Sequence, residues 1–332
     1  MTLAVRARPA RTGLGISLIV CAVFTMALQD AVVKYVSADL PLWQIYTLRS
    51  FIAIPMLVAA VFVLGGATTL RPRSLSWAML RGGLLVAMYI AFYAALPFLE
   101  LSLVAAAYYT GPLFITLFAA LFLGERVGGR EILAILIGFA GVLVILRPGT
   151  DAFAPIMLVP IAAAVFYALA NVLTRGKCLE ELALSLSLAL NFCFILCGGA
   201  MTAALALAGL PGETVSINPF LLGDWVPVAW GEWAVLFGLA LANVIIHLAL
   251  AKAYQSAPPQ KIATFDYSYL VFAALWGFLL FREIPDLPTL LGMVLIAGAG
   301  LLLVWRRGRV ARQSDSMPAQ AAGTTDRPSE RA

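Results

Sequence analysis

Charged residues are scarce in this chain of 332 residues: only 12% are Asp, Glu, Lys or Arg, and 62% are hydrophobic. Soluble domains typically carry about 25% charged residues and slightly less than half apolar ones. A chain with so little charge would expose large apolar patches to water. The composition therefore excludes an ordinary soluble domain and predicts an all-α integral membrane protein, whose solvent is lipid.

Residues that serve catalysis or metal binding are equally scarce. The chain has one histidine, His247, and no GxSxG or HExxH sequence. The spacing of Cys193 and Cys197 permits a metal pair, but it is more typical of small apolar filler. The formal charge of +5 comes from basic residues at helix ends, where membrane topology explains it. We therefore expect no enzyme, no cofactor, no metal and no nucleic acid partner.

Ten apolar segments of near-membrane length follow one another, and a bilayer core requires roughly 20 residues of helix. The predicted helices cover residues 13–36, 42–64, 77–98, 101–123, 131–146, 156–173, 183–207, 230–251, 259–281 and 288–305. The first segment is long and holds Gln29, Asp30 and Lys34 near its end, so we interpret it as a retained membrane helix rather than a secretory signal.

An internal duplication organises these segments, because residues 108–148 align with residues 266–306. The matched pairs are Tyr109 and Tyr267, Phe114 and Phe272, Leu121 and Leu279, Glu125 and Glu283, and, after one inserted residue, Gly141 and Gly300, Arg147 and Arg306. Each copy has five predicted helices, an odd number, so the two copies would enter the membrane from opposite sides. Inverted repeats of this kind are typical of alternating-access transporters.

Basic residues set the expected orientation. With the N-terminus in the cytoplasm, most Lys and Arg fall in cytoplasmic loops, and only Arg147 and Arg282 lie outside. The longest loop, residues 211–231, has no Lys or Arg at all. By the positive-inside rule, both termini should be cytoplasmic.

The sequences PLFITLFAALFLGERV and ILIGFAGVLVIL, present twice in degraded form, resemble the EamA repeat of the drug/metabolite transporter superfamily. The resemblance covers roughly residues 13–306 and implies ten helices, cytoplasmic termini and secondary transport of small organic solutes. Two stretches, DAVVKYVSADLPLWQIYTLRS and FREIPDLPTLLG, are similar to S-adenosylmethionine uptake carriers. The implied parts are a basic tail 1–12, a first EamA repeat 13–147, a linker 148–155, a second repeat 156–306 and a disordered tail 307–332.

Three charged residues lie at similar depth in the first two predicted helices. Asp30 and Lys34 are one turn apart and can pair along one face, and Arg49 is about two turns into the next helix. An ionisable group at bilayer depth costs roughly 2.5–3.5 kcal/mol on insertion scales, so each needs a partner or a function. The three residues form either a structural clamp or the lining of an outer vestibule, where Arg49 meets a substrate carboxylate or Asp30 an amine.

A second candidate group lies on the predicted helix 259–281. Asp266 is flanked by Tyr267 and Tyr269, and the repeat places it where the first copy has Tyr108, beside Tyr109; Trp276 follows two to three turns on. A carboxylate with aromatic neighbours suits a cationic or heteroaromatic solute. The alternative is a structural pair between Asp266 and Lys261 or Lys252.

His247 is the candidate for proton coupling, with Asn243 one turn before it. An unperturbed histidine titrates near physiological pH, although a lone histidine in a helix is more typical of a packing residue.

The predicted function is secondary active transport of a small metabolite that is zwitterionic, cationic or heteroaromatic, across the bacterial inner membrane. A proton or an exchanged solute would supply the energy, because the chain has no nucleotide-binding motif. Efflux of drugs or metabolites is the alternative, an intramembrane enzyme or channel is less favoured, and a homodimer stays open.

We predict that reporter fusions to the N-terminal tail and after Arg309 will report a cytoplasmic location, and that a fusion within residues 211–231 will report an external one. The physical reason is the distribution of Lys and Arg. Paired fluorescent and phosphatase reporters measure each site. A cytoplasmic signal from the long loop would contradict the topology.

Overall fold

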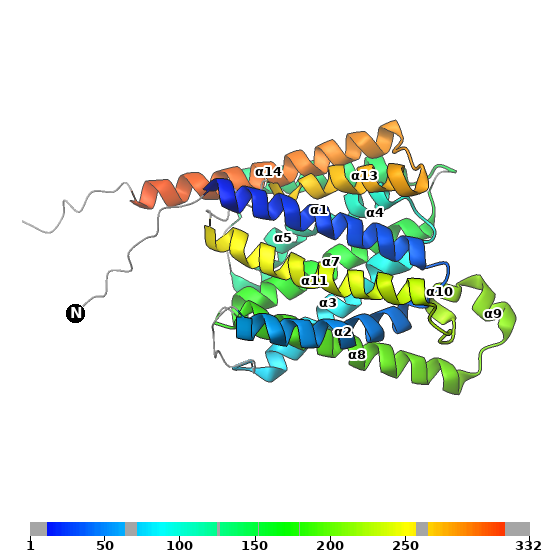
Figure 1. Cartoon of the computed structure of the whole chain (residues 1–332). Helices are drawn as coiled ribbons and strands as arrows, with labels where there is room; N and C mark the ends of the chain where they lie inside the picture. Colours follow the sequence, from blue (N-terminus) through cyan, green and yellow to red (C-terminus); the bar gives the residue numbers. More distant parts are fainter. Residues whose placement is uncertain are drawn as a thin grey trace, which may run out of the picture.

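The computed structural model describes residues 12–63, 72–124, 127–151, 153–178, 180–256 and 265–315. Within these ranges every regular element is a helix, and the long helices lie alongside one another in one bundle (Figure 1). The start of α1 and the end of α14 lie at one end of the bundle, and α9 and α10 lie at the other. The expected tail 1–12 and most of the expected tail 307–332 fall outside the described residues.

The first half of the chain supplies α1 (Thr12–Val36), α2 (Leu42–Val63), α3 (Leu75–Ala95), α4 (Leu101–Tyr108), α5 (Gly111–Leu123) and α6 (Gly129–Leu146). The second half supplies a short 3₁₀ helix η1 (Pro155–Leu158), α7 (Val159–Lys177), α8 (Ala183–Ala208), α9 (Gly212–Ile217), α10 (Pro219–Leu222), α11 (Trp230–Ser256), α13 (Ser268–Phe281) and α14 (Leu287–Asp315). The last helix continues past its predicted end near Trp305.

Among the described residues, seven stretches are long and apolar enough to cross a membrane. Three further apolar helices are shorter, namely Ile132–Leu146, Ser268–Phe281 and Leu287–Leu302. The bundle also carries large apolar side chains on its outside, such as Leu121, Val271 and Val294, each about two-thirds exposed or more. The chain is therefore a multi-pass membrane protein, and the count of ten spans stays a prediction.

The predicted helix 101–123 is interrupted in the middle. It divides into α4 and α5 at Tyr109 and Thr110, where the Thr110 hydroxyl donates to the Ala107 carbonyl at 2.6 Å. Pro112 contributes to the break because it has no backbone N–H to continue the helical ladder. In the second copy, Tyr267 lies in a turn directly before α13. Both helix breaks thus fall at tyrosines that the internal alignment matches.

The helix contacts have a regular pattern across the two halves. α6 packs on α14 and α2 on α8, so each of these two pairs joins equivalent helices of the two copies. The contact of α1 with α11 has a counterpart in the contact of α3 with α7. Likewise, the contact of α3 with α8 is matched by that of α2 with α11. The two halves are therefore interleaved rather than packed as separate lobes.

Close packing of α6 on α14 depends on glycine. A Cβ atom built on Gly292 would lie 2.3 Å from Cγ1 of Ile145 and 2.8 Å from the backbone oxygen of Gly141. A Cβ atom on Gly298 would meet no atom within 4 Å, so Gly298 takes no part in this close packing. The contact is made one and a half turns earlier, at Gly292.

We predict that Gly292→Ala will lower the free energy of unfolding of the purified protein by about 1–3 kcal/mol, because the added methyl group forces two helix backbones apart. Gly298→Ala on the same helix is the matched control and should leave stability unchanged or slightly raised. Thermal unfolding in detergent measures both variants. Equal effects at the two positions would contradict this packing.

Candidate functional site

Asp30 on α1 lies in the centre of a buried hydrogen-bond network. Its side chain accepts hydrogen bonds from the hydroxyl of Tyr93 on α3, at 2.9 Å, and from that of Tyr269 on α13, at 2.5 Å. The side-chain amide of Gln29 donates to the Tyr93 hydroxyl at 3.4 Å. Asp30 is only 4% exposed, so these tyrosines replace the hydration of its carboxylate. The network connects helices from both halves of the chain.

Arg49 on α2 is 1% exposed, and it contacts aromatic rings instead of a carboxylate. Its guanidinium carbon lies 4.8 Å from the ring centre of Phe194 on α8 and 5.8 Å from that of Tyr46. Within the described part of the chain, no acceptor lies within hydrogen-bonding distance of its Nε, Nη1 or Nη2. Among the described residues no ion pair joins Asp30 to Lys34 or Arg49, so the predicted clamp of three ion-paired charges is not formed, although the Arg49 charge acts on the Asp30 carboxylate at longer range.

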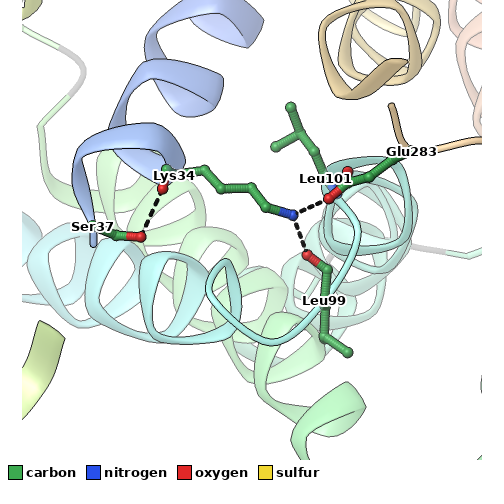
Figure 2. A network of polar contacts seen from close by, with 5 residues as sticks. All are labelled: Lys34, Ser37, Leu99, Leu101 and Glu283. Atoms are coloured by element: carbon green, nitrogen blue, oxygen red, sulfur yellow. Dashed lines mark hydrogen bonds and ion pairs between the residues drawn. The ribbon is translucent and has the colours of Figure 1, made fainter. Parts of the chain in front are cut away.

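Lys34 instead forms a contact between the two halves at the end of α1. Its ammonium group pairs with Glu283, between α13 and α14, and donates to the Leu99 carbonyl at 2.6 Å (Figure 2). The second oxygen of Glu283 accepts from the backbone N–H of Leu101, at the start of α4, at 2.9 Å. The Lys34 ammonium also lies 5.0 Å from the ring centre of Phe281. We call Lys34, Glu283, Leu99 and Leu101 the end latch.

A second ion pair lies at the same end of the bundle. Arg147, after α6, pairs with Asp286, which also accepts from the Thr289 backbone N–H at 3.0 Å and so caps α14. Hydrogen bonding from Thr289, with the nearby Arg147 charge, holds the pKa of Asp286 below its ordinary value. This pair is more exposed than the end latch, so water screens it more strongly.

Tyrosines surround the two helix breaks. Tyr109 stacks on Tyr269, with ring centres 5.0 Å apart, and lies 5.6 Å from Tyr267. Its hydroxyl donates to the backbone carbonyl of Asp266 at 3.3 Å. Tyr108 lies 5.3 Å from Tyr167 on α7. The structure therefore brings Tyr108, Tyr109 and Tyr267 together in one cluster that continues through Tyr269 to Asp30, and Asp266 joins this cluster through its backbone carbonyl.

The remaining candidate residues either lie apart from this cluster or have side chains that the structure does not describe. Trp276 packs on Phe24 of α1, at 5.3 Å between ring centres, rather than on the tyrosines. Asn243 is buried on α11, 5% exposed. The side chains of His247 and Lys261 lie outside the described residues, so neither the coupling role nor the pair of Asp266 with Lys261 is tested.

Sequence reasoning missed several members of the site. Tyr93, which donates to Asp30, and Phe194, which covers Arg49, were not among the candidates, and Tyr269 was expected beside Asp266 rather than as a donor to Asp30. Glu283 is next to Arg282 in the sequence, but its ion pair is with Lys34. The available signal for Tyr269 was its spacing, because it lies two residues after Tyr267 beside the helix break.

Residues 13–147 match the family described as EamA-like transporters. The pseudopaline exporter CntI of Pseudomonas aeruginosa is 30% identical to this chain over 87% of the chain and 95% of the exporter. The chain belongs to the EamA-like transporter family. The family resemblance expected from the duplicated segments is thereby confirmed.

Other relatives of this EamA protein are also named transporters. An S-adenosylmethionine uptake transporter of Rickettsia felis is 25% identical over 88% of this chain and 92% of the relative. A riboflavin transporter of Vibrio cholerae is 26% identical over 86% of this chain and 92% of the relative. A solved crystal structure, 20% identical, has the same fold, with a TM-score of 0.57 over 90% of this chain and 98% of the other. The names of family and relatives indicate membrane transporters, not enzymes.

We predict that Glu283→Gln in this EamA protein will lower the free energy of unfolding by up to about 3–5 kcal/mol. The substitution leaves the largely buried Lys34 charge of the end latch without a counter-charge. The double variant with Lys34→Met should lose less stability than the single variant. Thermal unfolding in detergent measures both.

The matched control is Glu180→Gln, which removes a carboxylate from the exposed pair with Arg73, where both side chains are more than 70% exposed. It should change stability by at most about 1 kcal/mol. Similar losses in Glu283→Gln and Glu180→Gln would show that the end latch adds nothing to stability.

Proposed function

We propose that this EamA protein is a secondary active transporter that carries a small organic metabolite across the bacterial inner membrane by alternating access. The observation that carries the proposal is the buried network of Asp30, Tyr93 and Tyr269, which polar groups from both halves of the chain build inside an apolar bundle. Ionisable groups at such depth are a substrate or ion site by default.

The arrangement of the halves supports alternating access. Equivalent helices pack on one another, and the matched helix breaks at Tyr109 and Tyr267 touch through their rings. Discontinuous helices at the interface of inverted repeats are where such transporters bind their substrates. The end latch would then be a gate on the external side, closed here, whose opening separates α1 from the loop between α13 and α14.

We assign the substrate site to Asp266, Tyr108, Tyr109, Tyr267, Asp30 and Arg49. Tyrosine faces suit a planar or cationic group, and Asp266 would bind a positive charge. Trp276 would lie at the edge of the site, beyond Phe24. His247 and Asn243 on α11 stay the proposed coupling residues. Cytoplasmic termini and ten spans are part of this proposal.

The relatives support a substrate of this class, and they leave two directions of transport. The printed names include S-adenosylmethionine uptake and riboflavin transport, but the 30% identical relative is an exporter. Efflux of a metabolite is therefore the second candidate function, favoured by that relative.

We predict that proteoliposomes with the purified protein will exchange labelled S-adenosylmethionine or riboflavin for the same unlabelled solute, and that Asp266→Asn will weaken the apparent affinity about ten- to a hundredfold. The loss reflects one charge-assisted contact with a positive group. Counterflow, measured with and without a pH gradient, gives affinity and coupling separately.

Asp151→Asn, in the linker outside the bundle, is the matched control and should exchange solute normally. Normal affinity in Asp266→Asn, at normal expression, would remove Asp266 from the site. Catalysed conversion of the solute, without exchange, would contradict the transport function itself.

A further inference from the structure

Arg49 has the least satisfied charge in the described bundle. A guanidinium has five N–H donors and no acceptor. In the residues described here, none accepts from Nε, Nη1 or Nη2, although the side chain is 1% exposed. The rings of Phe194 and Tyr46 attract the cation through their faces, but ring faces do not satisfy N–H donors in the plane of the guanidinium.

Two hydroxyl donors lie within one turn of Arg49 on α2. Tyr46 lies three residues before Arg49 and four before Ser50, spacings at which helix residues are neighbours, and Ser50 follows Arg49 directly in the sequence. The Tyr46 hydroxyl and the Ser50 hydroxyl are both buried, and neither has a hydrogen-bond partner in the part of the chain described. One turn of α2 therefore presents a cation and two hydroxyls that all await an acceptor.

The protein does not supply this acceptor from its nearest carboxylate. Both oxygens of Asp30 accept from tyrosine hydroxyls, and no ion pair joins Asp30 to Arg49 among the described residues. Among the described residues these donors therefore stay available to a bound molecule. Such a molecule would accept hydrogen bonds from α2, in the first half of the chain. It would also lie near α8, in the second half, because Phe194 packs against the same guanidinium.

The charge around Arg49 favours a group with one negative charge. Asp30 and Arg49 together are electrically neutral, and the surrounding side chains are aromatic. A carboxylate fits the planar fork of a guanidinium in a bidentate way and brings a single charge. A phosphate dianion would add a second charge, which the aromatic surroundings would not solvate.

Resting on the proposed transport function, we propose that Arg49 is the receptor for a substrate carboxylate, assisted by Tyr46 and Ser50. The carried metabolite is then a zwitterion with a carboxylate and a positive group, rather than a simple cation or a neutral heteroaromatic compound. The positive group lies toward the acidic and tyrosine-rich part of the site. The substrate thereby supplies the acceptor that the buried guanidinium lacks.

The test compares probes that differ only in the carboxylate. S-adenosylmethionine is paired with its decarboxylated form, and phenylalanine with phenethylamine; riboflavin and inorganic phosphate represent solutes without a carboxylate. Binding to the detergent-purified full chain is measured by thermal shift and calorimetry, without reference to transport. At least one carboxylate probe should bind about ten- to a hundredfold more tightly than its decarboxylated partner.

The variants Arg49→Met and Tyr46→Phe separate binding from folding. Arg49→Met should abolish the preference for the carboxylate and raise the melting temperature of the ligand-free protein, because it removes an unpaired buried charge. Tyr46→Phe should weaken carboxylate binding and leave the fold intact. Arg73→Gln, which removes an exposed arginine, should alter neither quantity.

Each outcome bears on the proposal. Equal binding of paired probes, binding of only riboflavin or phosphate, or no binding by either carboxylate probe would overturn it. A lower melting temperature in Arg49→Met would assign Arg49 a structural role and overturn it as well. Carboxylate-dependent binding without exchange in proteoliposomes would refute the transport function but support the role of Arg49 in binding a carboxylate. Exchange without a preference for carboxylate probes would support the transport function but refute that role of Arg49.

Discussion

Lipid offers no hydrogen-bond partners, and this one constraint underlies the whole structure. Every polar group inside the bundle must find its partner in the protein or in a bound molecule. The bundle therefore has an outside of Leu, Val and Phe side chains and an inside that holds Gln29, Asp30 and Arg49. In a soluble protein the outer surface would carry polar and charged side chains instead. The polar interior is concentrated where helices of the two halves meet, and this is the place where a solute could be surrounded from both sides.

Asp30 and Arg49 satisfy this constraint in different ways. Asp30 is held by hydroxyls from α3 and α13, so its charge is stabilised by the fold itself. Arg49 has ring faces against its guanidinium and, among the described residues, no hydrogen-bond acceptor, so its donors stay open to a ligand. A carrier needs both kinds of group. A fully satisfied network keeps the helices in register, and an unsatisfied donor binds the solute with energy that the empty protein lacks.

The end latch applies the same physics at the surface of the bundle. Lys34 and Glu283 are far apart in the sequence, and each also binds the backbone around the start of α4. The contact therefore joins three segments that would have to separate if this end opened. Such a contact is strong when water is excluded and weak when water enters. The latch thus has the property required of a gate, a closed state that solvent entry destabilises.

Much of the fold follows from the sequence alone, because apolar length and charge distribution act locally: the starts and ends of α1, α2 and α8 agree with the predicted segments within a few residues. The duplication also placed Tyr109 beside Tyr267. The interaction partners of the charged side chains, by contrast, could not be predicted from the sequence. Lys34 is one turn from Asp30 yet pairs with Glu283, and no carboxylate of the described residues forms an ion pair with Arg49. The partner of a side chain in a helical bundle depends on which groups of other helices lie within reach. Those distances between helices are set by the tertiary structure and cannot be read from the sequence.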